Sequence, residues 1–133
     1  MGDIDMFGFF KKKESADRKA MREEFEEHIR VLRHTDDATK MAVGYGINIA
    51  NSMFIKRYGS VKAFSQQSMS EKINYIHSLN EFEAKMSDQD PLFVVGASLF
   101  KKWIAALIEE DKELMSQFSK ELDYFSRKGD INF

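Results

Sequence analysis

Apolar residues recur at steps of three and four along most of the chain, which is the spacing of one buried face of an α-helix. No stretch alternates strictly between apolar and polar residues, as a half-buried strand would. The pattern therefore predicts an all-α, single-domain bundle of about five helices. These are expected at approximately residues 15–34, 36–58, 60–67, 69–86 and 91–128.

The second predicted helix differs from the others because no charged residue occurs between Met41 and Ile55. Apolar side chains point in nearly every direction around it, so we expect it to be the buried, central helix. Small residues follow one another at four-residue steps and predict a ridge where another backbone approaches closely; they are Ala38, Ala42, Gly46 and Ala50. We interpret Gly44-Tyr45-Gly46 in the same way, as a packing feature.

The last predicted helix begins clearly at Asp90-Pro91, an N-cap acid followed by a proline at the first helical position. Its periodicity continues to about Lys128, but the charged block 109–113 interrupts it. Either one long helix bends there, or two helices meet with Asp111 as a cap. We favour the single helix.

Residues 1–13 fall outside the helical pattern and are assigned as an N-terminal arm, with the bundle domain at 14–133. The arm combines aromatic residues with a run of lysines: Phe7, Phe9, Phe10, Lys11, Lys12 and Lys13. The first interpretation is that the phenylalanines fold back to fill a gap in the bundle. The alternative is weak, reversible attachment to a membrane surface or to a partner, since aromatic residues beside lysines suit an interface.

Composition excludes several classes of function. The chain of 133 residues contains 20 basic and 22 acidic residues, a net charge of -2, so nucleic-acid binding is not expected. It contains no cysteine, which removes disulfides and thiolate chemistry and favours a cytoplasmic location. We find no catalytic motif and no metal-ligand spacing, and therefore expect neither an enzyme nor a bound cofactor or metal.

Three polar residues within apolar surroundings suggest a polar interior site. Asn48 and Asn51 lie in the uncharged stretch, and Glu83 falls inside the apolar arc of helix 69–86. Buried amides must be hydrogen-bonded. They either bond a neighbouring helix, the interpretation we favour, or line a small ligand pocket. For Glu83 we favour a frayed helix end over a buried carboxylate.

Two acidic runs are the remaining candidates. Such runs are usually solvated faces, but on a small, nearly neutral helical domain they also suit docking of a basic partner protein. The candidate partner-binding residues are Glu23, Glu24, Glu27, Glu109, Glu110, Asp111 and Glu113.

The sequence thus favours a small cytosolic protein-binding module, most concretely an inhibitor or regulator of the immunity or antitoxin type. The alternatives are a bundle with a ligand or metal in a polar interior site, and a peripheral membrane protein that uses the arm. A homodimer is a further option, because Phe100, Trp103 and Ile104 predict a wide apolar face.

Overall fold

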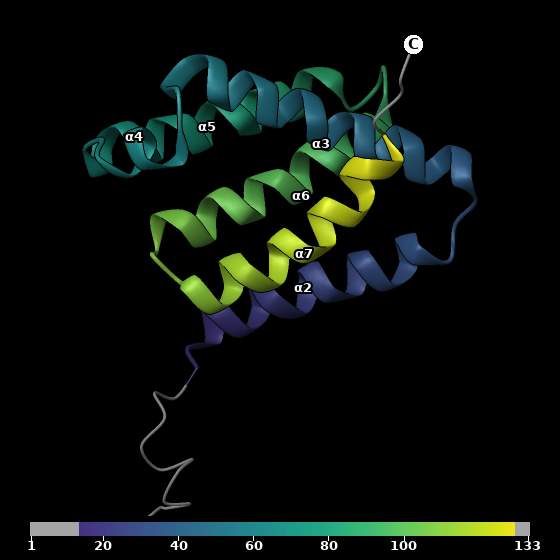
Figure 1. The fold of residues 1–133 in the computed structure, drawn as a ribbon, viewed down its shortest axis with the longest axis horizontal. Coiled ribbons are helices and arrows are strands. Elements are labelled where there is room, and N and C mark those ends of the chain that lie inside the picture. The colour runs from purple at the N-terminus through teal and green to yellow at the C-terminus, as the bar shows by residue number, and fades with distance from the viewer. Residues whose placement is uncertain (1–13, 130–133) are drawn as a thin grey trace, which may run out of the picture.

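The computed structural model describes residues 14–129, and these form six α-helices without a strand. The all-α bundle is therefore confirmed, with one helix more than expected. The helices, labelled in Figure 1, are α2 (Ala16–Arg33), α3 (Asp37–Tyr58), α4 (Val61–Ser65), α5 (Met69–Met86), α6 (Pro91–Ile108) and α7 (Lys112–Lys128).

Every helix begins at a polar residue whose side chain accepts a hydrogen bond from the backbone N–H three residues further on. A cap of this kind satisfies one of the donors that the first turn leaves unpaired, and contributes about 1 kcal/mol. These short polar side chains explain why the predicted starts agree so closely with the observed ones. The capping residues are Ser15, Asp36, Ser60, Ser68, Asp90 and Asp111.

The prediction of a single helix over 91–128 is wrong, because the chain turns between Ile108 and Lys112. Glu110 adopts a left-handed φ of 56°, and its N–H donates to the carbonyl of Leu107. The N–H of Asp111 donates to the carbonyl of Ala106, which completes a Schellman ending. The Asp111 carboxylate then caps α7 by accepting from the N–H of Leu114.

α3 lies at the centre of the bundle, as predicted. It packs extensively against α6 and α7, while α5 packs against another side of α6 (Figure 1). α2 lies on the outside, beside α7, and buries only Phe25, Ile29 and Leu32. α6 is the one described helix that is long and apolar enough to cross a membrane, but half of it is buried among its neighbours, as in the core helix of a globular bundle.

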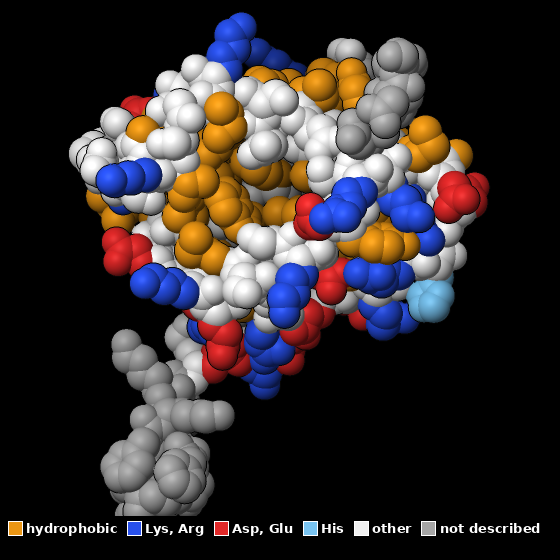
Figure 2. Space-filling view, viewed as in Figure 1, with side chains coloured by type: hydrophobic (Ala, Val, Ile, Leu, Met, Phe, Trp, Pro, Cys, Tyr) orange, Lys and Arg blue, Asp and Glu red, His pale blue; other side chains and the backbone are white. Residues whose placement is uncertain are grey.

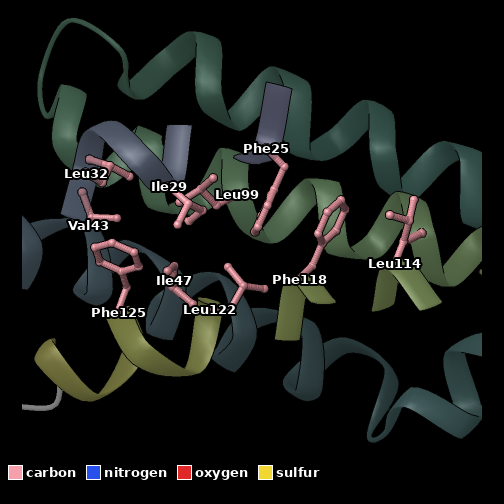
Figure 3. Close-up of a cluster of buried hydrophobic side chains, with 11 residues drawn as sticks. Phe25, Ile29, Leu32, Val43, Ile47, Leu99, Leu114, Phe118, Leu122 and Phe125 are labelled. Atoms are coloured by element: carbon pink, nitrogen blue, oxygen red, sulfur yellow. The ribbon is translucent and has the colours of Figure 1, made fainter. Parts of the chain in front are cut away.

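The core consists of two hydrophobic clusters that share Trp103 and Met115 at their boundary. The first, shown in Figure 3, joins α2, α3, α6 and α7, and includes stacked rings of Phe25 and Phe118 with centroids 3.9 Å apart. The second surrounds the buried ring of Phe54. It also contains Phe100 and Ile104, which are 3% and 0% exposed.

Burial of those two side chains corrects one prediction. The face of Phe100, Trp103 and Ile104 is not exposed as expected, because Phe100 and Ile104 lie in the second cluster and the half-buried Trp103 packs edge-on against Phe54. α3 and α5 cover this face because aromatic residues of both helices pack into the same cluster. The homodimer itself stays a prediction.

Glycines bring the backbones of α3, α6 and α7 into direct contact. A Cβ added to Gly44 would lie 1.9 Å from the carbonyl oxygen of Phe125 on α7, and one on Gly46 would lie 2.3 Å from that of Phe93 on α6. Gly96 of α6 is equally confined, 2.1 Å from the carbonyl oxygen of Val43. The predicted role of Gly44 and Gly46 in close packing is confirmed. Of the predicted ridge, Ala38 is exposed and lies outside the contact.

Replacing Gly44 by alanine should therefore destabilise the bundle strongly. The new methyl group overlaps a backbone atom that no side-chain rotation can move, so we expect a loss of about 3 kcal/mol in the free energy of unfolding. Ser52→Ala on the exposed face of the same helix is the control, with an expected change within about 0.5 kcal/mol. Urea unfolding followed by circular dichroism measures both. Equal stability of the two variants would show that α3 and α7 do not approach at Gly44.

Candidate protein-docking groove

A groove of about 1060 Å³ lies between α2, α5 and the end of α6. Its floor is apolar and contains Ile73 and Ile76 from α5, Ala105 and Ile108 from α6, and Met21 from α2. Ile73 is 44% exposed.

The rim of the groove is predominantly acidic. Two cationic residues, Arg18 and Lys112, also line it. The segment from Glu14 into the first turn of α2 and the segment from Glu109 into α7 supply six carboxylates, namely Glu14, Asp17, Glu109, Glu110, Asp111 and Glu113. Figure 2 shows acidic and basic side chains at the lower edge of the molecule, where Figure 1 places the N-terminal ends of α2 and α7.

Arg18 holds the two halves of this rim together. Its guanidinium donates to both carboxylate oxygens of Asp111, over 2.6 and 3.3 Å, and to Oε1 of Glu113 over 2.7 Å. It also donates to Glu14, which Arg22 binds through two hydrogen bonds of 2.9 Å each. Forked contacts of this type fix geometry as well as charge, so the start of α2 is attached to the start of α7.

The arginines favour the ionised forms of two carboxylates in this cluster, those of Glu14 and Asp111. Hydrogen bonds from Arg22 and then Arg18 lower the pKa of Glu14 to about 2, against the opposing effect of burial. The hydrogen bond from Arg18, helped by the N–H of Leu114, likewise lowers the pKa of Asp111. Glu14 and Asp111 therefore keep their negative charges into the acidic range.

The predicted acidic run at 109–113 lines the groove, and the predicted run at 23–27 does not. Glu109, Glu110, Asp111 and Glu113 all line it, although Arg18 occupies two of the four. On α2, Glu27 pairs with Arg30, Glu24 lies 3.7 Å from Lys102, and Glu23 is exposed. Carboxylates at 23, 24 and 27 point away because the buried stripe of α2 takes the side that faces α7.

Three other predicted residues lie away from the groove. Asn48 exchanges two hydrogen bonds with Ser126 of α7, accepting from its hydroxyl and donating over 3.0 Å to its carbonyl. It thus bonds a neighbouring helix, as favoured. With the exposed Asn51 it lines a separate hollow of about 200 Å³ between α3, α6 and α7. That this hollow binds a ligand stays a prediction.

Glu83 does not belong to that hollow, and the expectation of a frayed helix end is wrong. It lies within α5, its side chain is 18% exposed, and the Nζ of Lys101 on α6 is 2.9 Å from its Oε2. Lys101 also donates to Asn80 over 2.7 Å. The carboxylate is tolerated in the apolar arc because α6 supplies a cation opposite it.

The six arm residues Phe7, Phe9, Phe10, Lys11, Lys12 and Lys13 lie outside the described residues. Within residues 14–129, His, Asp and Glu side chains form no group of three that could hold a metal ion.

Sequence reasoning missed Glu14, Asp17 and the apolar floor of the groove. One signal was present: the apolar arc of helix 69–86 covers about half of its circumference, more than one neighbouring helix can bury. Part of that arc, at Ile73 and Ile76, forms the floor.

No protein-family model, curated protein or solved structure significantly matches the chain. Its function must therefore be inferred from the residues and their arrangement.

Glu14→Gln should lower the free energy of unfolding by an amount that depends on pH. The folded-state pKa of Glu14, about 2, lies below the ordinary value of 4.5. Its contribution to stability is thus fully present above about pH 4.5 and is lost as the pH falls toward 2. We expect the variant to be less stable than the wild type at neutral pH, and the difference to shrink below pH 4.5.

Urea unfolding at about pH 7, 4.5 and 3 measures this difference. Glu23→Gln is the matched control, because Glu23 is exposed on the same helix and forms no ion pair with another described residue. A stability difference for Glu14→Gln that is unchanged at pH 3 would contradict the arrangement.

Proposed function

We propose that the protein is a helical binding module that docks a basic segment of a partner protein in the groove between α2, α5 and α6. The observation that carries the proposal is the combination of an apolar floor with an acidic rim in one groove of about 1060 Å³. An apolar centre surrounded by polar residues is the usual composition of a protein interface.

The charge of the rim favours a cationic partner. Six carboxylates and two cationic residues line the groove. Fields of this kind speed the association of oppositely charged proteins and disfavour anionic partners. The same charge argues against attachment of this surface to nucleic acid or to an anionic membrane.

In its most concrete version, the proposal is an inhibitor or regulator of the immunity or antitoxin type that acts in the cytoplasm. Small size, the absence of a catalytic motif and of cysteine, and an acidic docking surface support it. A basic enzyme or nucleic-acid-binding protein is the partner of matching charge.

The test compares two variants with the same change in net charge. Glu109→Lys/Glu110→Lys reverses two rim charges that form no ion pair with other described residues, and Glu23→Lys/Glu27→Lys reverses two on the outer face of α2. Each is used as bait in native lysate at about 0.15 M salt, where longer-range interactions between exposed charges are screened. Captured proteins are identified by mass spectrometry and rebound in purified form.

We expect a basic protein that the wild type and the α2 variant retain and that the rim variant loses by at least about tenfold in affinity. Partners that bind all three baits equally, or no rim-dependent partner at all, would contradict the proposal.

A further inference from the structure

The groove has the geometry of a site for one more helix. α2 and α5 both pack against α6, and no comparable packing joins α2 to α5. Ala105 and Ile108 at the end of α6 line the hollow between these two helices, where Ala105 is partly exposed and Ile108 is 9% exposed. At about 1060 Å³ the groove lies at the upper end of the roughly 300–1,000 Å³ typical of small-molecule sites, so it has room for a polypeptide segment.

The floor presents side chains in helical register. Ile73 and Ile76 are three residues apart on α5, as are Ala105 and Ile108 on α6. Residues at this spacing form the ridges and grooves into which the side chains of another helix pack. Ala105 is the smallest of these four side chains and leaves more room for an inserted side chain than an isoleucine would.

The acidic residues are asymmetrically distributed along the groove. Glu109 and Glu110 directly follow the C-terminus of α6, where the helix dipole adds partial negative charge. Both residues are exposed, whereas Glu14 and Asp111 are engaged by arginines. A lysine or arginine of a bound segment is thus best accommodated beside Glu109 and Glu110.

We infer that the groove binds a short amphipathic helix with one apolar face and flanking lysines or arginines. Its apolar residues, spaced by three and four, would cover Ile73, Ile76 and Ile108, and its cations would meet the rim. This inference rests on the proposed function and specifies the class of partner. Helix-in-groove recognition needs this pairing of apolar anchors with a complementary rim.

The experiment uses the full chain and three fluorescein-labelled peptides of about 18 residues, long enough for several helical turns. The first contains leucines at helical spacing with lysines on the opposite face. The second has the same composition in an order that destroys the apolar face. The third replaces every lysine of the first by glutamate. Fluorescence anisotropy measures affinity, and circular dichroism measures the helicity of the bound peptide.

We expect the first peptide to bind at least about tenfold more tightly than the other two and to gain helicity on binding. Ile73→Ser should weaken its binding about tenfold, because it removes an apolar anchor from the floor. Met53→Ser is the matched control. It is similarly exposed, at 49% against 44% for Ile73, but lies on α3 and does not line the groove, so it should leave the affinity unchanged.

Equal binding of the first two peptides, or equal effects of Ile73→Ser and Met53→Ser, would overturn the inference. Failure of the first peptide to bind would overturn it as well. The proposed function is tested separately by the lysate experiment. If that experiment recovers a basic partner that depends on the rim, the proposed function holds, and the segment that the groove binds is not helical.

Discussion

Direct backbone contact at glycines is the constraint on which the rest of this structure depends. Gly44 and Gly46 of α3 face the carbonyl oxygens of Phe125 and Phe93, and Gly96 of α6 faces that of Val43. A side chain at any of these positions would separate helices that share one hydrophobic core. Glycine in a helix costs about 1 kcal/mol relative to alanine, and the close packing of three helices offsets that cost.

The groove is a consequence of this crossing. α3 and α5 pack against different sides of α6, and the groove lies between α2, α5 and the end of α6. The Schellman ending at Glu110 then directs the chain into α7, and it leaves Glu109 and Glu110 at the edge of the opening. Arg18 closes the same edge from α2 by binding Asp111 and Glu113. An apolar floor and an acidic rim are thus produced by the packing of the bundle itself.

Local signals in the sequence were sufficient for most of the fold. Helix starts followed from capping residues such as Ser68 and Asp90, and the central helix followed from the charge-free stretch around Gly44 and Gly46. The break at Glu110 was not predictable in the same way. A left-handed turn usually takes glycine, and glutamate there is selected by how α6 and α7 pack.

The site was less accessible to sequence reasoning because it depends on contacts between distant segments. The run from Glu109 to Glu113 was identified from the sequence. Its combination with Glu14 depends on Arg18, which contacts Asp111 and Glu113 at separations of 93 and 95 positions along the chain. Glu83 is a similar case, because a carboxylate in an apolar arc is explained only by Lys101, which α6 places beside it. Charge patterns on one helix do not reveal which partner lies opposite.

Native-state hydrogen exchange tests the central claim most directly. If the glycine crossing holds the bundle together, the amides of Val43, Ile47 and Leu99 should exchange only through global unfolding, with the same free energy as urea unfolding gives. The first turns of α2 lie outside the glycine contacts and are attached through Arg18 and Glu14. Their amides should exchange through a local opening that has a smaller free energy. Lower protection at Val43 and Ile47 than in α2 would contradict the account.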